Sequence, residues 1–285
     1  MEGMIPVRKG RCAGEGDWHR QYQALRMTAE EAAALIRPGD VVAMSAAANW
    51  PREVDRALTA RLRAQGEKIE VDSLDALPDT YLLSPENTGC VEYHSNFFFA
   101  ERNMVGQGNV HFVPTNLSVT GLWMASRHPR VAVLTCSPPN PEGWMSRSLW
   151  GASLQRKVME QCETVIVEVN AQMPAFPSDG ESHMLVHVSE VDAIVEVNRP
   201  PEENPPAEAD DLDRSIAGYI ADLVEDGSCV QFGLGGLANA VGACLAYAGK
   251  KDLGVQTEVL SNCLVDLIKK GVVNNSRKQT CPGRT

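Results

Sequence analysis

The fold is decided by the stretch Thr164-Val165-Ile166-Val167-Glu168-Val169. Its β-branched residues favour a strand, and a nearly continuous apolar run is typical of a strand that is buried on both faces. Strands of this kind occur mainly in parallel sheets that helices cover on both sides. The stretch therefore predicts a buried strand in a mainly parallel sheet.

Helical and strand-like patterns alternate on both sides of this strand. Thr28 and Glu31 form a capping box, which predicts the start of a helix that runs through Ile36. Strands separated by helices imply crossover connections in a parallel sheet, so the sequence predicts the α/β class. Further strands are expected at 41–44, 69–71, 131–135 and 193–197, and helical spacing at 54–62 and 154–162.

A proline-rich segment divides the chain. The stretch 199–206 contains four prolines, which remove backbone donors and fix the backbone, so it cannot form a helix or a central strand. We expect an N-terminal lead-in at 1–27, a first α/β domain at 28–198, a linker at 199–207 and a second α/β domain at 208–285.

The second domain is expected to begin like the first, with alternating helices and strands. Too few residues follow the linker to complete such a domain, so we expect it to be incomplete and the chain to be truncated. The predicted elements are helices at 211–223 and 236–248 and strands at 228–232 and 255–257.

The composition disfavours several classes of protein. A formal net charge of −11 at pH 7 argues against a nucleic-acid or anionic-membrane surface, because these partners need clustered Lys and Arg. The eight cysteines form no closely spaced pair, so buried free thiols are expected and no metal module is predicted. The sequence contains no run typical of a leader or a membrane span. We therefore expect a reduced, cytoplasmic protein that acts on small molecules.

The most informative stretch for function is Gln231-Phe232-Gly233-Leu234-Gly235-Gly236-Leu237-Ala238. A predicted strand runs here into a glycine-rich turn and then into a helix. Glycine lets backbone N–H groups approach a ligand closely, and a helix N-terminus favours negative charge. We expect Gly233, Leu234, Gly235 and Gly236 to bind a ligand, although a tight strand-to-helix turn explains the same glycines.

This loop and the next acidic residue fit a dinucleotide site. Residues 233–238 match the pattern G-x-G-x-x-G/A, and Glu258 follows about 20 residues later, where an acid that binds the cofactor ribose is found. An NAD-dependent oxidoreductase is therefore one hypothesis. It leaves too little chain after residue 211 for the remaining strands of such a domain.

The same pair of features fits nucleophilic catalysis. Glu258, at the end of a predicted strand beside the loop, is placed to attack the carbonyl carbon of a bound thioester. A glutamate side chain in water is ionised at pH 7 and needs no partner base. Because a carboxylate is a weak nucleophile, positioning has to supply much of the acceleration, and well-oriented groups gain about 7–11 kcal/mol in this way. Glu168 and Glu190 are alternative carboxylates, which ion pairs explain equally well.

Several further segments, taken together and in order, decide between these hypotheses. They are Thr28–Ala32 with Arg37–Asp40, Ser137–Asn140 with Gly143, Val165–Asn170 with Met173-Pro174, His187–Asp192, Gln231–Gly235, Asp252–Glu258, Asp266-Leu267 and Gly271–Asn275. Through these segments the chain resembles the acetyl-CoA hydrolase/4-hydroxybutyrate CoA-transferase family, which belongs to the class I CoA-transferases. The resemblance extends from about Trp18 to the last residue.

The resemblance implies two similar open, mainly parallel α/β domains with the active site between them. It implies that Glu258, in the segment Thr257-Glu258-Val259, is the nucleophile. The implied enzyme moves CoA between short-chain acyl groups of the acetyl, butyryl or 4-hydroxybutyryl type through an acyl-glutamyl anhydride and a glutamyl-CoA thioester. Acetyl-CoA hydrolysis is the same chemistry with water as the acceptor.

The resemblance also implies the partners. These are acyl-CoA and small carboxylates, and coenzyme A is a substrate rather than a tightly bound cofactor. A homodimer is implied, whereas nucleic acid and membranes are not expected as partners.

Two features depart from the family. After the nucleophile the family usually has Ser-Asp-Gly, whereas this chain has Ser261-Asn262-Cys263, and loss of the glycine is expected to narrow the backbone conformations of this turn. The family's chains are also longer, and the missing part carries a second glycine-rich loop with an oxyanion donor. A third hypothesis is therefore an acyl-CoA-binding fragment without activity.

Other segments carry weaker signals of function. His183 and His187 are spaced like metal ligands on a helix, but the apolar residues around them favour a strand, so a role for His187 in packing or at the domain interface is preferred. Ser137-Pro138-Pro139-Asn140 follows a predicted strand and is either part of a site or a rigid turn. The three phenylalanines within Asn96–Glu101 are expected in the core rather than in an acyl pocket, although the family resemblance places this stretch near the cleft.

Overall fold

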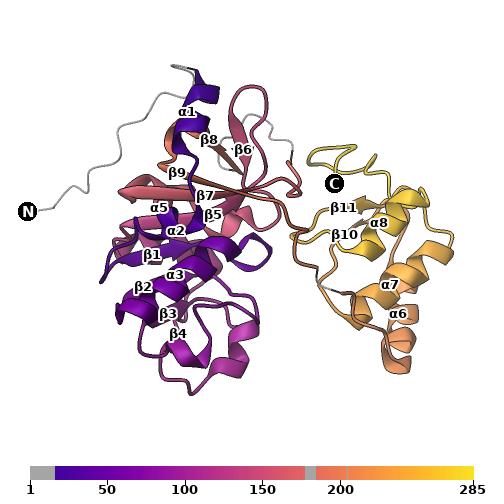
Figure 1. The fold of residues 1–285 in the computed structure, drawn as a ribbon. Helices are drawn as coiled ribbons and strands as arrows, with labels where there is room; N and C mark the ends of the chain where they lie inside the picture. Colours follow the sequence, from indigo (N-terminus) through magenta and orange to yellow (C-terminus); the bar gives the residue numbers. More distant parts are fainter. Residues whose placement is uncertain (1–16, 177–183, 204) are drawn as a thin grey trace, which may run out of the picture. The chain divides into compact units, whose positions relative to one another are not determined.

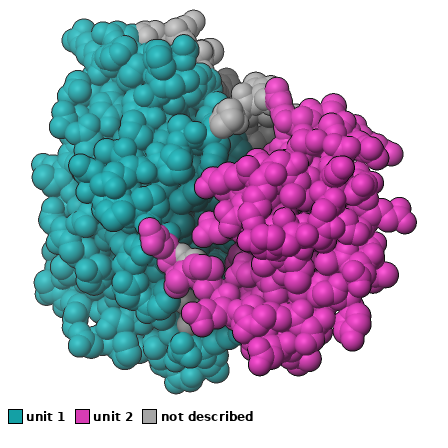
Figure 2. All heavy atoms as spheres, turned by 90° about the vertical axis from the view of Figure 1, so that its right-hand side faces the viewer, with its two compact units in different colours: residues 1–202 teal, residues 203–285 magenta. Residues whose placement is uncertain are grey.

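The computed structural model describes residues 17–176, 184–203 and 205–285. The chain divides into two compact units, unit 1 (Met1–Glu202) and unit 2 (Glu203–Thr285), which Figure 2 shows in different colours. The boundary between them falls inside the proline-rich stretch 199–207. Each unit has its own hydrophobic core.

Unit 1 is built on a seven-stranded sheet in the order β4-β3-β2-β1-β5-β7-β9, and all neighbouring strands are parallel (Figure 1). The order reverses between β1 and β5, and ligands of open parallel sheets bind at the carboxyl ends of strands near such a point. The parallel α/β class predicted from the sequence is confirmed. The strands are β1 (Val41–Met44), β2 (Ile69–Ser73), β3 (Val91–Ser95), β4 (Val110–Phe112), β5 (Val131–Cys136), β7 (Thr164–Asn170) and β9 (Ala193–Val197).

Helices cover both faces of this sheet. Helices α2 and α3 contribute to the core on one face, and α1, α4 and α5 contribute to the core on the other. They are α1 (Trp18–Leu25), α2 (Ala29–Ala33), α3 (Arg52–Gln65), α4 (Thr120–Ser126) and α5 (Arg156–Gln161).

The central strands are apolar because both of their faces are covered. Val131 and Val133 of β5 belong to one core, and Ala132 and Leu134 belong to the other. All six residues of β5 are buried. The alternation of side chains along a strand therefore sends every second residue into each core.

The predicted capping box opens α2. The Thr28 hydroxyl accepts a hydrogen bond from the Glu31 N–H at 3.1 Å, and the Glu31 carboxylate accepts one from the Thr28 N–H at 2.8 Å. Helix α3 ends at Gly66, which has a φ of 66°. The start of α2 and the end of α3 are therefore both determined by residues close by in the sequence.

A small antiparallel sheet joins β6 (Trp144–Ser146) to β8 (Leu185–His187), with Trp144 opposite His187. The strand expected around His187 is therefore present. His183, the other half of the proposed metal-ligand pair, lies outside the described residues.

In its described residues, unit 2 contains a two-stranded parallel sheet and three helices. Strand β10 pairs with β11, and Val230 lies opposite Val255. Both strands are shorter than predicted, whereas α6 and α7 have nearly the predicted bounds and α8 was not predicted. The elements are α6 (Asp211–Leu223), β10 (Cys229–Val230), α7 (Gly236–Tyr247), β11 (Gly254–Val255) and α8 (Asn262–Lys269).

The prediction that all three phenylalanines at 97–99 lie in the core is wrong. Phe97 is 52% exposed and Phe99 is 56% exposed. Phe98 packs edge-to-face on Phe112 with the ring centroids 5.2 Å apart. The physical reason is that these residues follow β3 in a connecting segment, and connecting segments run over the surface.

Within the described residues, no helix combines the length and the apolar character needed to cross a membrane.

Candidate active site

The two predicted parts of the site lie at the same edge of the β10–β11 sheet. Val230 and Val255 are paired, and each is the last residue of its strand. Gly233 and Glu258 both lie three residues beyond these partners. Because the strands are parallel, the structure brings the glycine loop and the acid to one end of unit 2.

Thr257 joins the segment of Glu258 to the loop. Its hydroxyl lies 3.4 Å from the Phe232 carbonyl oxygen and 2.9 Å from the Val259 carbonyl oxygen, and it donates to these acceptors. Phe232 is the residue before Gly233, so the start of the loop and the residue before Glu258 are held together.

The three glycines of the loop differ in what the fold requires of them. Gly235 has φ 130° and ψ 174°, a conformation that is essentially limited to glycine. At Gly236 an added Cβ would lie 2.5 Å from Asp213 Oδ2 and 2.6 Å from the Glu208 carbonyl oxygen, so this glycine permits close packing.

Gly233 is under neither constraint. Its φ lies outside the left-handed range, and in the described part of the chain no atom lies within 4 Å of a Cβ built on it. The described structure of unit 2 therefore gives no steric or conformational reason for a glycine here. Leu234, the next residue, is 60% exposed.

The Glu258 carboxylate is accessible. The side chain is exposed, and the residues that the structure describes form no hydrogen bond or ion pair with its carboxylate. An accessible carboxylate without a partner keeps both oxygens available for an incoming electrophile.

The departure at Cys263 does not strain the turn. Cys263 is the second residue of α8, and its φ lies outside the left-handed range, so this position does not require a glycine conformation. Its Sγ lies 3.1 Å from the Ser261 hydroxyl oxygen and 3.7 Å from the Ala238 carbonyl oxygen. A Cβ added to Gly242 of α7 would lie 2.6 Å from the Cys263 Cβ, so the cysteine packs directly against that glycine.

Two side chains to which the sequence analysis gave no role bind the edge of β11 that faces away from β10. Asn275 Oδ1 accepts a hydrogen bond from the Val255 N–H at 2.8 Å, and Lys278 Nζ donates one to the Val255 carbonyl at 2.8 Å. Lys278 is 8% exposed, and its Nζ also donates to the Arg284 carbonyl at 2.6 Å. A lysine in a polar stretch carries no local sign of burial, so sequence reasoning missed it.

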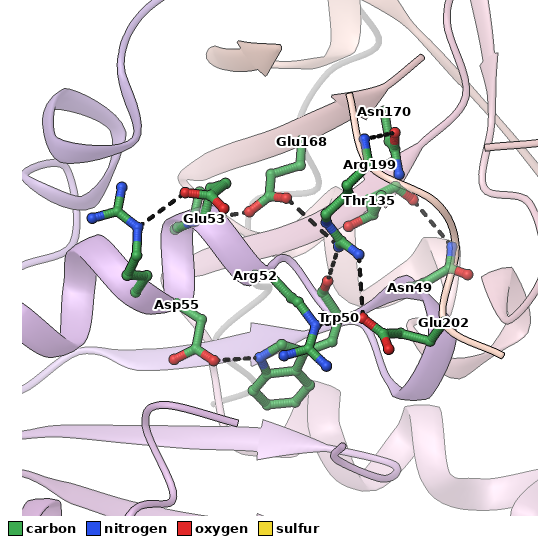
Figure 3. A network of polar contacts seen from close by, with 12 residues as sticks. Asn49, Trp50, Arg52, Glu53, Asp55, Thr135, Glu168, Asn170, Arg199 and Glu202 are labelled. Carbon is green, nitrogen blue, oxygen red and sulfur yellow. Dashed lines mark hydrogen bonds and ion pairs between the residues drawn. The ribbon is translucent and has the colours of Figure 1, made fainter. Parts of the chain in front are cut away.

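Glu168, an alternative carboxylate, caps a helix. It lies on β7 and is fully buried, and its Oε1 accepts a hydrogen bond from the Val54 N–H at 2.8 Å (Figure 3). Helix α3 begins after Pro51, which forms no side-chain cap. Glu168 therefore takes the place of the missing cap and brings a negative charge to the positive end of α3.

The surroundings of Glu168 also change its protonation. Burial raises the pKa of Glu168 to about 7, while the Val54 N–H and the Arg199 guanidinium act in the opposite direction. Arg199 Nη2 lies 4.0 Å from Glu168 Oε2. An enclosed carboxylate of this kind does not fit attack on an external thioester.

Glu190 and His187 support each other in a structural cluster. Glu190 Oε2 accepts a hydrogen bond from the His187 N–H at 2.7 Å, and Glu190 also pairs with Arg156. His187 Nε2 lies 3.0 Å from the Glu142 carbonyl oxygen and therefore donates to it, while Nδ1 lies 2.8 Å from the Ser189 hydroxyl. With both ring nitrogens engaged, His187 has the packing role that was preferred.

Ser137-Pro138-Pro139-Asn140 forms the turn between β5 and β6. The Ser137 hydroxyl accepts from the Ser146 N–H at 3.0 Å, and Asn140 Oδ1 accepts from the Trp144 N–H at 2.8 Å. The polar side chains of this segment are used within the turn, so the structure supports the rigid-turn explanation.

Comparisons with known proteins show which family the chain resembles. The family described as acetyl-CoA hydrolase/transferase N-terminal domain matches residues 11–202. The chain is 33% identical over 270 residues to the succinyl-CoA:cyclohexane-1-carboxylate CoA transferase of Geobacter metallireducens, and this match covers 94% of the chain and 60% of the relative. It is 29% identical to the butyryl-CoA:acetate CoA-transferase of Anaerostipes caccae, with 90% of the chain and 58% of the relative covered. The structure of RipA from Yersinia pestis matches with a TM-score of 0.84 at 32% identity and covers 95% of this chain and 63% of RipA.

The chain thus spans about 60% of the length of these relatives. Neither of the two named enzymes is an oxidoreductase, so the dinucleotide hypothesis gains no support. Because the family match runs from residue 11 to residue 202 and covers more than half of the sequence, the chain belongs to the acetyl-CoA hydrolase/transferase family.

Proposed function

We propose that this chain carries the nucleophile of an acyl-CoA:carboxylate CoA-transferase and that Glu258 is this nucleophile. The observation that carries the proposal is the position of an exposed carboxylate, unpaired among the described residues, three residues beyond β11 and at the same sheet edge as Gly233. The names of the relatives support the reaction type, since both are CoA transferases.

The proposed reaction proceeds through covalent intermediates on Glu258. One carboxylate oxygen attacks the thioester carbonyl carbon, the C–S bond breaks, and CoA leaves as the thiolate, which gives an acyl-glutamyl anhydride. The thiolate then attacks the glutamyl carbonyl and releases the acyl group as a free carboxylate, which leaves a glutamyl-CoA thioester. An acceptor carboxylate reverses these two steps and leaves as its CoA ester, while water in its place gives hydrolysis.

The glycine loop is proposed to bind the acyl-CoA. Gly233 leaves the backbone open to close approach, and Gly235 sets the turn from which α7 begins. Helix α7 has no side-chain cap of its own, so its first N–H groups are available to a negatively charged or polar group of the ligand.

The wider assignment rests on the family resemblance. We infer short-chain acyl groups of the acetyl, butyryl or 4-hydroxybutyryl type, a cytoplasmic location and a homodimer. Light scattering of the purified protein tests the homodimer, and a panel of acyl-CoA donors with acetate as acceptor tests the acyl preference.

Trapping of the covalent intermediate tests the proposed function directly. Incubation with acetyl-CoA followed by borohydride reduces a glutamyl-CoA thioester to the alcohol, and peptide mass spectrometry should then find the change on Glu258. Binding of CoA without any modification would instead support the silent acyl-CoA-binding fragment. Binding of NAD without modification would support the dinucleotide hypothesis.

Substitution of Glu258 is the corresponding genetic test. Glu258→Ala and Glu258→Gln should each lower CoA transfer by at least about 10³-fold, because the group that forms the covalent bond is lost. Glu225→Gln, which changes an exposed acid of the same unit, is the matched control and should keep full activity. Appreciable transfer by Glu258→Ala would refute the assignment.

A further inference from the structure

Strand β11 is held on one edge by a strand and on the other by side chains. Toward β10, the Gly254 N–H donates to the Ser228 carbonyl at 2.9 Å, and the Gln256 N–H donates to the Val230 carbonyl at 3.2 Å. On the opposite edge, the N–H and the carbonyl of Val255 are bonded by the side chains of Asn275 and Lys278. The last residue of the strand before Glu258 therefore has both of its outward backbone groups fixed by side chains.

The lysine is an unusual choice for this contact. An ammonium group loses much of its hydration when it is buried, so burial is costly unless other groups compensate for it. Lys278 is 8% exposed and binds two carbonyl oxygens, those of Val255 and Arg284, and in the described residues it forms no ion pair with a carboxylate. A charged donor gives a hydrogen bond roughly twice as strong as a neutral one, so the Val255 carbonyl is held firmly.

Gly254 makes room for this lysine. A Cβ added to Gly254 would lie 2.7 Å from the Lys278 Cγ, and the φ of Gly254 lies outside the left-handed range. The glycine is therefore needed for the passage of the Lys278 side chain rather than for its own backbone conformation. Gly254 and Lys278 therefore act together, since the glycine leaves the space that the lysine needs to bind β11.

These contacts lie close to Glu258 in the sequence. The segment from Val255 to Glu258 is anchored at Val255 by Lys278 and Asn275 and at Thr257 by the hydroxyl contact to the Phe232 carbonyl. A carboxylate nucleophile depends on accurate placement, and a displacement of about 1 Å costs roughly 10²-fold in rate.

We infer that Lys278 is a positioning residue for Glu258, and that it acts by holding the Val255 carbonyl at the end of β11. This inference rests on the proposed nucleophilic role of Glu258. According to this inference, Lys278 contributes to the covalent step without contacting the substrate.

The test is Lys278→Met, which keeps most of the side-chain stem and removes the donor. We expect kcat for acyl transfer to fall by about 10²-fold while KM for acyl-CoA changes by less than about threefold, and we expect Lys278→Arg to recover part of the loss. Hydrogen exchange of the amides at 256–259 should accelerate by at least about tenfold, while the amides of α8 are unchanged. Lys269→Met, an exposed lysine of the same unit, is the control and should behave as the wild type.

The two readouts separate this inference from the proposed function. If the wild-type protein is never acylated at Glu258, the proposed function fails, and unchanged exchange at 256–259 in Lys278→Met would overturn the positioning claim independently. A variant that is less stable but keeps kcat would also overturn it, because the lysine would then serve only the fold. If Lys278→Met does not fold, Gly254→Ala displaces the lysine stem more mildly and should change both readouts in the same direction.

Discussion

At the scale of the residue, a buried carboxylate makes the stability of unit 1 depend on pH. Burial raises the pKa of Glu168 to about 7, whereas a glutamate in an unfolded chain has a pKa of about 4.3. The folded state therefore holds the proton more tightly than the unfolded state does. The contribution of Glu168 to stability is greatest below about pH 4.3 and falls as the pH rises to about 7.

Glu168→Gln should remove this dependence. Glutamine keeps a carbonyl oxygen for the Val54 N–H and carries no charge, so the variant should gain about 3 kcal/mol in unfolding free energy relative to the wild type between about pH 4.5 and pH 7.5. Urea unfolding at a series of pH values measures this difference. Burial also raises the pKa of Asp55 to about 6, but that group is present in both proteins and cancels.

The control for this prediction is Glu142→Gln, which changes an exposed acid of the same unit. Its difference from the wild type should be flat with pH. A flat difference for Glu168→Gln as well would contradict a strongly raised pKa at this site.

At the scale of the element, two glycines of the loop before α7 are expected to have different roles, Gly235 in stability and Gly233 in ligand binding. Gly235→Ala should lower the unfolding free energy by about 1–3 kcal/mol, since alanine cannot adopt φ 130° and ψ 174° without strain. Gly233→Ala should change stability by less than about 0.5 kcal/mol, because its φ is ordinary and the space around it is open in the described structure.

For substrate binding the order is reversed, and Gly233→Ala is expected to have the larger effect. Gly233→Ala should raise KM for acyl-CoA by about tenfold or more if the ligand approaches this backbone. Chemical denaturation and steady-state kinetics on both variants give the comparison. An unchanged KM for Gly233→Ala would remove this residue from the proposed binding loop.

Local sequence patterns predicted most of the helices and strands. Contacts between residues far apart in the sequence could not be predicted in this way. The capping box at Thr28 and the strands at 41–44 and 193–197 were correct because they depend on neighbouring residues alone. Strand β3 was missed because polar Glu92 and His94 interrupt its apolar residues. The cap of α3 joins residues 54 and 168, and no local pattern contains such a contact.

At the scale of the whole molecule, we expect unit 1 to fold independently. Its parallel sheet is covered on both faces by two cores that consist of its own residues. A fragment of residues 1–202 should therefore fold and unfold cooperatively, and its stability should show the pH dependence of Glu168. Circular dichroism during thermal unfolding tests this, and the absence of a cooperative transition would contradict it.

The contact between Cys263 and Gly242 bears on how relatives of this chain can diverge. The thiol on α8 fills the space that a methyl group on α7 would require, so bulk at one position has to be exchanged for bulk at the other. Such an exchange involves the facing positions of α7 and α8. The side chain of Cys263 is therefore accommodated by a glycine on the facing helix.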